Sequence, residues 1–233
     1  MRRSGIYLLV LALSPSSAAA QRQVDPTKLV HDLRAGTVEP DVARALDLTC
    51  ANRELQADTS RVQLTKNQTF SVVQAYDVMC DRRAVVVLQA AGSRWEHIQT
   101  ILLSTLLGVQ PTVTFPDLLG SGEHEIVVGG QLVDHGTGVD QNNMTIFKLI
   151  GDQLQVVFDA PESVHFEQGS AKGLFSVEQH SVFRFVQNPE SKGKEQMISE
   201  VQRLTVGGKT TTRYRNWTWD PALQRFRCYE TAP

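Results

Sequence analysis

The order of apolar and polar residues divides the chain into a short helical beginning and a long β-rich remainder. A helix start at Asp25 is followed by apolar residues at helical spacing up to Gly36. A second start at Glu39 leads into another short apolar series, so residues 26–56 are predicted to form a helical hairpin. From about Arg61 onward apolar and polar residues alternate between Gly, Pro, Asn and Asp, as is typical of strands joined by turns.

Twelve segments of this remainder are strand candidates. They are Phe70–Tyr76, Ala84–Gln89, Trp95–Leu102, Thr112–Phe115, Glu125–Gly129, Met144–Leu149, Leu154–Phe158, Val164–Phe166, Leu174–Phe185, Met197–Thr205, Thr211–Trp219 and Phe226–Tyr229. Their length and spacing predict a mostly β fold of antiparallel repeated sheets, either a partial propeller or a sandwich, behind a short N-terminal helical hairpin. The expected division is a signal peptide at 1–20, a helical segment at 21–58 and a β-repeat domain at 59–233.

The first 20 residues have the features of a secretory signal peptide. Arg2 and Arg3 precede an apolar run, Ile6–Leu13, and a small-residue cleavage site ends at Ala20. We therefore expect a secreted or periplasmic protein with no membrane span after cleavage, because no later stretch is long enough to cross a bilayer. Removal of these residues takes away two arginines and no acid, which changes the formal net charge from -2 to -4.

Composition narrows the functional classes. Of the 233 residues, 41% are hydrophobic and 21% are charged, which fits a folded globular protein and excludes a disordered or collagenous one. The 23 basic residues nearly balance the 25 acidic ones, so bulk charge gives no reason to expect nucleic-acid binding.

The three cysteines allow at most one intramolecular disulfide in an oxidising compartment. We expect the bridge between Cys50 and Cys80, with three reduced thiols as the alternative. Cys228 shares strand parity with Phe226, so we expect it to be an inward-facing thiol in the last strand.

An internal repeat is visible at an offset of 71 residues. The segment from Asp117 to Gly122 leads into an apolar run, and the segment from Asn188 to Gly193 does the same. Gln131 falls on Gln202 at the same offset. In each copy a later strand is predicted to begin with a polar residue followed by a large apolar one, at residues 153–154 and at residues 225–226.

A shorter, earlier copy is predicted to end at residues 94–95, with Asp77–Asp81 in the place of the loop. Repetition of a loop and a hairpin in an exported β protein favours sheets arrayed side by side.

The run from Phe115 to Val128 resembles the FG-GAP and VCBS repeats of integrin-alpha-like propellers and of many exported bacterial proteins. Those repeats carry the pattern D-x-[DN]-G-D-G-x-x-[DE] before an apolar strand, and the resemblance implies a calcium loop in which alternate carboxylates converge on the ion. In this chain Leu119 stands at the third position and Ser121 at the fifth. The ligands that the resemblance implies are therefore Asp117, Ser121 and Glu125. The alternative is a turn without an ion, so that no cofactor is required.

The C-terminal strands carry a second candidate site. Alternate positions place Arg213, Arg215, Trp217 and Trp219 on one face, and Arg225 and Arg227 share a parity on the next strand. If these two faces coincide, guanidinium groups lie beside indole rings. Such a surface is suited to a sugar, an anionic glycan or the carboxylates of a partner.

These observations favour an exported, non-catalytic binding module built from degenerate FG-GAP-like repeats. Its expected partner is an extracytoplasmic protein or a glycan. The alternative is a secreted hydrolase acting on polysaccharide, with Asp117 and Glu125 as the acid and base. A third reading is a carrier that encloses a small ligand in one deep apolar cavity.

Overall fold

The computed structural model describes residues 24–48, 51–77, 82–104, 111–136, 139–170 and 173–230. Within these ranges it contains two short helices and twelve strands. They are α1 (Pro26–Ala35), α2 (Pro40–Ala45), β1 (Gln56–Thr65), β2 (Gln68–Asp77), β3 (Arg82–Ala91), β4 (Arg94–Ser104), β5 (Thr112–Thr114), β6 (Ile126–Gly136), β7 (Val139–Ile150), β8 (Gln153–Ser170), β9 (Gly173–Gln187), β10 (Gln196–Val206), β11 (Lys209–Asp220) and β12 (Arg225–Glu230). The predicted mostly β class, with short N-terminal helices, is confirmed.

The helices begin and end where their residue types require. The Asp25 carboxylate accepts a hydrogen bond from the Lys28 amide at 2.8 Å, and Gly36 ends α1 at a φ of 65°. The predicted helical segment is too long, because α2 ends at Ala45 and β1 already begins at Gln56. The alternation in β1 is weak, since this strand lies at the edge of its sheet and buries few of its residues.

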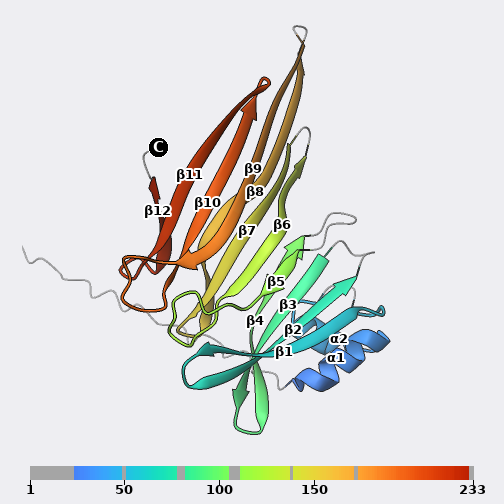
Figure 1. Cartoon of the computed structure of the whole chain (residues 1–233). Coiled ribbons are helices and arrows are strands. Elements are labelled where there is room, and N and C mark those ends of the chain that lie inside the picture. Colours follow the sequence, from blue (N-terminus) through green and yellow to red (C-terminus); the bar gives the residue numbers. More distant parts are fainter. Residues whose placement is uncertain are drawn as a thin grey trace, which may run out of the picture.

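All twelve strands follow an antiparallel meander in two open sheets, β1–β4 and β5–β12. The second sheet is a continuous series of eight strands, which we divide between β8 and β9. The described strands then form three four-stranded units, β1–β4, β5–β8 and β9–β12 (Figure 1). The fourth strand of each unit begins with the polar residue that the repeat predicted, at Arg94, Gln153 and Arg225.

Strand pairing between the second and third units is confined to their distal halves. Ser163–Ser170 of β8 pair with Gly173–His180 of β9. Nearer the helices the two strands separate. The distal strands extend well beyond the β1–β4 sheet (Figure 1). Because β8 and β9 separate, the remaining halves of the two units can stack face to face.

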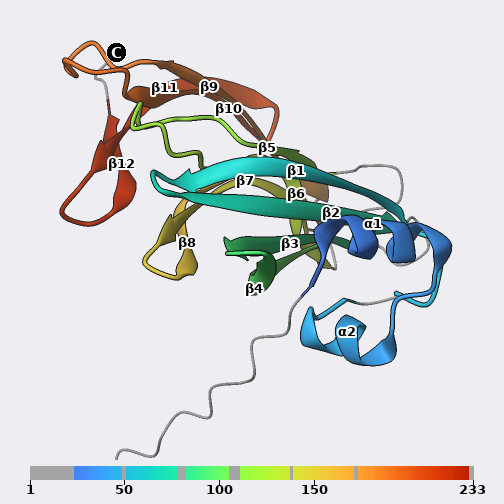
Figure 2. The same ribbon diagram turned by 90° about the horizontal axis from the view of Figure 1, so that it is seen from below.

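Three apolar cores hold the layers together. The first joins both helices to one face of β1–β4 and includes Leu33 and Leu46. The second joins the opposite face of β1–β4 to β6–β8, where Phe70 and Leu103 pack with Ile126. The third joins the other face of β6–β8 to β9–β12. The helices and β9–β12 therefore lie at opposite ends of the stack (Figure 2).

Several predictions fall partly or wholly on residues without a described placement. Cys50 and Cys80, the expected disulfide, lie outside the described residues, as does the predicted signal peptide. Neither α1 nor α2, the helices found in the described ranges, is long and apolar enough to cross a membrane.

Candidate binding surface

The loop between β5 and β6 is organised by its own hydrogen bonds. The two carboxylate oxygens of Asp117 accept from the amides of Ser121 at 3.0 Å and Gly122 at 2.9 Å. The Ser121 hydroxyl accepts from the Glu123 amide at 3.3 Å. Two of the three predicted calcium ligands thus bind backbone N–H groups of the same loop.

Glu125, the third predicted ligand, is fully buried and paired with a cation from the protein itself. Its Oε1 accepts from the Lys148 ammonium at 2.9 Å, and its Oε2 accepts from the Leu118 amide at 2.9 Å. Burial raises the pKa of Glu125, and the charge of Lys148 opposes that rise. Lys148 also contacts Glu123 at 3.2 Å.

This geometry gives no support to the metal and hydrolase interpretations of the loop. The described residues contain no group of three or more His, Cys, Asp or Glu side chains arranged to hold a metal ion. The ammonium of Lys148 binds Glu125 where a calcium ion would compete for it. A carboxylate with no exposed surface also has no contact with a glycoside, so Asp117 and Glu125 are not placed as an acid and base.

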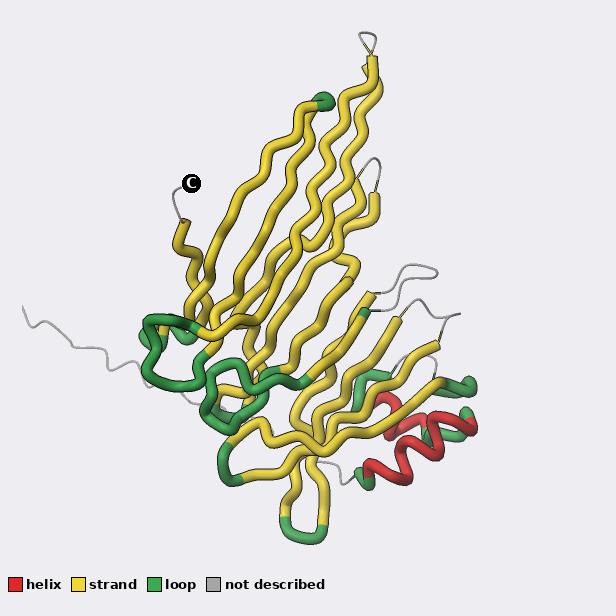
Figure 3. The backbone as a smooth tube through the Cα atoms, in the orientation of Figure 1, coloured by secondary structure: helices red, strands yellow, loops and turns green. Residues whose placement is uncertain are grey.

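The two repeated loops lie side by side (Figure 3). The Gln196 amide donates to the Leu118 carbonyl at 2.7 Å, which ties the loop between β9 and β10 to the loop between β5 and β6. Gly120, at a φ of 63°, packs against Lys194, and a Cβ added there would lie 2.6 Å from the Cβ of Lys194. Both loops occupy the same position in their units, between the first and second strands.

The predicted third copy of the loop, Asp77–Asp81, lies outside the described residues from position 78 onward, and its place in the chain differs from that of the other two copies. The segment after Asp77 lies between the second and third strands of its unit, whereas the first and second strands are joined by a tight turn at residues 66–67. The first unit therefore shares the strand order of the other two but not their long loop.

The predicted arginine and tryptophan surface is divided by the strand register. Trp217 pairs with Cys228 and Thr218 pairs with Arg227, so the two odd-numbered sets point to opposite sides of the sheet. A residue shares its face with its direct cross-strand partner, and that register cannot be read from either strand alone. Arg225 and Arg227 are thus separated from Trp217 and Trp219.

The two tryptophans contribute to the third core. The ring centroids of Phe158 and Trp217 are 5.1 Å apart, and those of Trp219 and Phe226 are 5.5 Å apart. Both pairs pack edge to face. The Trp217 indole donates at 3.1 Å to Glu200, a buried carboxylate that also accepts from the Ser181 hydroxyl.

Arg213 and Arg215 lie on the same inward side of β11 as the tryptophans. The Arg215 guanidinium lies 3.6 Å from Glu200. Four of the six predicted ligand-binding residues therefore belong to the side of the sheet that faces the second unit.

The opposite side of β9–β12 is uncovered, and we call it the outer face. Val182, Val201 and Tyr214 are paired across its centre, and Val182 and Tyr214 are 54% and 61% exposed. The apolar and aromatic residues of the outer face are Val182, Val186, Met197, Val201, Tyr214 and Tyr229.

Arginines stand among these residues on three of the four strands. Arg184 is on β9, Arg203 on β10, and Arg225 and Arg227 on β12, all exposed. The described side chains of this face include two acids. Glu178 lies toward the distal end of β9, and at the opposite end of the face lies Asp220. It lies 3.3 Å from Arg227. The outer face therefore carries a local positive charge, opposite in sign to the chain as a whole.

Sequence reasoning missed the residues at the centre of this face, although a signal was present. In Ser181–Gln187 both parities of β9 are apolar, with Val182 and Val186 on one side and Phe183 and Phe185 on the other. Such a strand has apolar residues for both faces of its sheet. The structure covers only one of them.

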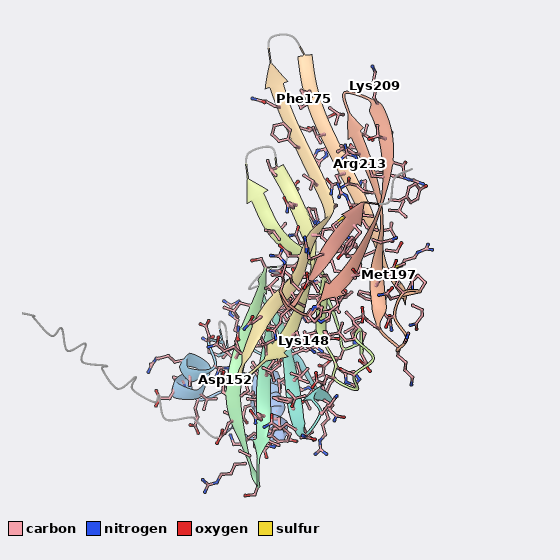
Figure 4. All side chains as sticks on the ribbon, turned by 90° about the vertical axis from the view of Figure 1, so that its left-hand side faces the viewer. Lys148, Asp152, Phe175, Met197, Lys209 and Arg213 are labelled. Atoms are coloured by element: carbon pink, nitrogen blue, oxygen red, sulfur yellow. The ribbon has the colours of Figure 1, made fainter. Side chains whose placement is uncertain are left out.

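A second uncovered apolar area lies near the distal ends of the long strands, on the other side of the sheet. Val177 of β9 pairs with Phe166 of β8 on one side and with Val206 of β10 on the other. The ring centroids of Phe166 and Phe175 are 6.3 Å apart. Figure 4 shows Phe175 and Lys209 near the ends of their hairpins, far from Met197, Lys148 and Asp152.

Comparison of the chain with models of known protein families, with curated proteins and with solved structures finds no match.

Proposed function

We propose that this chain is an exported, non-catalytic binding module of degenerate FG-GAP-like units, and that it binds its partner through the outer face of β9–β12. One observation carries the proposal: the stack of three units is capped at one end and uncovered at the other. The signal-peptide pattern of residues 1–20 supports export.

Stacked units need a cap wherever an apolar face would otherwise meet water. At the first unit α1 and α2 provide that cap, because Leu33 of α1 and Leu46, the residue that follows α2, are fully buried in the core shared with β1–β4. At the third unit no described element covers the outer face, and Val182, Tyr214 and Tyr229 are all more than half exposed. A monomer that leaves such an apolar area in water commonly uses it to bind.

The composition of the outer face is also that of a protein interface. Tyrosine, methionine and arginine are enriched in interface centres, whereas lysine and glutamate are depleted there. Tyr214, Tyr229 and Met197 lie on this face together with four arginines. Its described side chains include no lysine and one glutamate, Glu178, toward the distal end of β9.

Site-specific photo-crosslinking tests the location of the binding surface. A photoreactive residue at Val182, on the outer face, is compared in the producing organism with one at Val156, which is equally exposed at 55% but belongs to the second unit. We expect a discrete crosslinked partner from position 182 and none from position 156. Equal products from both positions, or none from position 182, contradict the proposal.

Incubation with a glycan panel tests the non-catalytic part. Fully buried Glu125 bound to Lys148 predicts no product release. Release that disappears in Asp117→Ala and Glu125→Ala variants of normal stability would establish the hydrolase instead.

A further inference from the structure

We infer that the partner is a protein whose binding surface combines apolar residues with carboxylates. This inference rests on the proposed function and adds the chemistry of the partner to it. Its basis is the pairing of an aliphatic centre with an arginine-rich surround on one uncovered sheet face.

The positive charge of the outer face favours a partner whose binding surface is negatively charged. Arg184, Arg203, Arg225 and Arg227 stand against two acids, Asp220, which already contacts Arg227, and Glu178 toward the distal end of β9. Arginine binds carboxylates through two parallel hydrogen bonds, and opposite charges across an interface favour one partner over others. A partner with acidic side chains at matching positions satisfies these guanidinium groups, whereas a basic or neutral one leaves them unpaired.

The shape and chemistry of the centre favour a protein over a glycan. Val182, Val201 and Met197 present aliphatic surface on a continuous sheet. Sugar sites use aromatic platforms with polar groups around a hollow. Trp217 and Trp219 are in the third core, and Tyr214 and Tyr229 stand on the continuous sheet beside these aliphatic residues. Apolar side chains of another protein fit an aliphatic sheet face.

A second copy of the chain is a poor partner in a two-fold arrangement through this face. In such an interface each copy presents the same patch to the other, so the two arginine sets would meet. Like charges brought together across an interface are costly. The expected complex is therefore between this chain and a different, acidic protein.

Fluorescence anisotropy with defined polymers tests the inference. The probe is a labelled random copolymer of glutamate and tyrosine, and the comparison polymers are a lysine and tyrosine copolymer and polygalacturonate. We expect the mature chain, residues 21–233, to bind the glutamate copolymer at least tenfold more tightly than either comparison polymer, with an affinity that falls as salt rises.

Two double variants locate the effect. Arg184→Glu with Arg203→Glu should weaken binding of the glutamate copolymer at least tenfold. The matched control, Arg53→Glu with Arg61→Glu, reverses two exposed arginines near the first unit and should leave binding unchanged. Circular dichroism melting confirms that both variants are folded.

The outcomes separate this inference from the proposed function. Equal binding of both copolymers, or no loss in the Arg184 and Arg203 variant, overturns the acidic partner, and a crosslink from position 182 would then still support a binding surface. Tighter binding of polygalacturonate overturns the inference in favour of a glycan. A dimer in sedimentation that dissociates in Val182→Asp overturns it in favour of a second copy.

Discussion

At the scale of single residues, strand register decides which side chains of β11 are structural. Trp217 packs against Phe158 and donates to buried Glu200, whereas Tyr214 points outward from the same strand. We predict that Trp217→Ala lowers the free energy of unfolding by about 3–5 kcal/mol, as for a large core residue, and that Tyr214→Ala changes it by less than about 1 kcal/mol. Urea unfolding measures both. A larger loss for Tyr214→Ala would mean that the two faces are reversed.

The buried pair of Lys148 and Glu125 gives a second prediction at this scale. Their side chains are 11% and 1% exposed, so Lys148→Met leaves a buried carboxylate without its cation. We expect a loss of about 3–5 kcal/mol at neutral pH and a smaller loss when Glu125→Gln is added. A double variant no more stable than Lys148→Met would contradict this account of the pair.

The pH dependence of these variants follows from the raised pKa of Glu125. Between the ordinary pKa of 4.5 and the raised value, the folded state binds more protons than the unfolded state. The free energy of unfolding therefore falls as pH rises through that window. Lys148→Met should raise the pKa of Glu125 further, so that the free energy of unfolding falls over a wider pH range and by a larger total amount. Glu125→Gln should remove the contribution of this carboxyl to the pH dependence. Urea midpoints measured across pH 4–8 check the sign, and a midpoint that rises with pH in Lys148→Met would refute it.

Gly120 and Gly122 form a matched pair that tests the contact between the two loops. Both have a positive φ, of 63° and 81°, so alanine strains the backbone at either position by roughly 1–2 kcal/mol. At Gly120 the added Cβ also meets Lys194 at 2.6 Å, and at Gly122 it meets nothing within 4 Å. Thermal melting should therefore show a clearly lower Tm for Gly120→Ala. Equal losses would show that the loops are not in contact.

At the scale of elements, the loop between β5 and β6 is organised by hydrogen bonds and an ion pair within the protein. Asp117 binds two loop amides, and Glu125 binds Lys148. A ligand that binds only the folded state raises its stability, so we predict the same Tm in chelator and in millimolar calcium. A rise of several degrees with calcium would restore the ion that the FG-GAP resemblance implies.

Much of the element order could be predicted from the sequence, because it depends on local patterns. The helix start at Asp25, the end at Gly36 and the first residues of three fourth strands were all readable from capping residues, turns and alternation. β1 was missed because an edge strand buries few residues and its alternation is weak. β8 was divided into two candidates because the register shift between Asn142 and Asn143, opposite Pro161–Ser163 of β8, interrupts the alternation.

The candidate site could not be predicted in the same way, because it depends on strand pairing and on contacts between residues distant in the sequence. The parity of Arg213–Trp219 within one strand was readable, but its alignment with Arg225 and Arg227 required the pairing of β11 with β12. The partners of Asp117 and Glu125 likewise depended on folding, because Lys148 is 23 residues from Glu125 in the chain.

At the scale of the whole molecule, the arrangement is a stack with unlike ends. Helices cover the first unit, the second unit packs against a core on each of its faces, and the third unit presents arginines, tyrosines and aliphatic residues to solvent. The same fold thus provides stability at one end and a surface of opposite charge to the rest of the chain at the other.

Methyl-resolved NMR of the mature chain, titrated with the glutamate and tyrosine copolymer, tests this account most directly. We predict chemical-shift changes at Val182, Val201 and Met197 on the outer face, with Val156 and buried Leu33 unchanged. Changes confined to Val206 on the distal area, or to the second unit around Val156, would contradict the outer face as the binding surface.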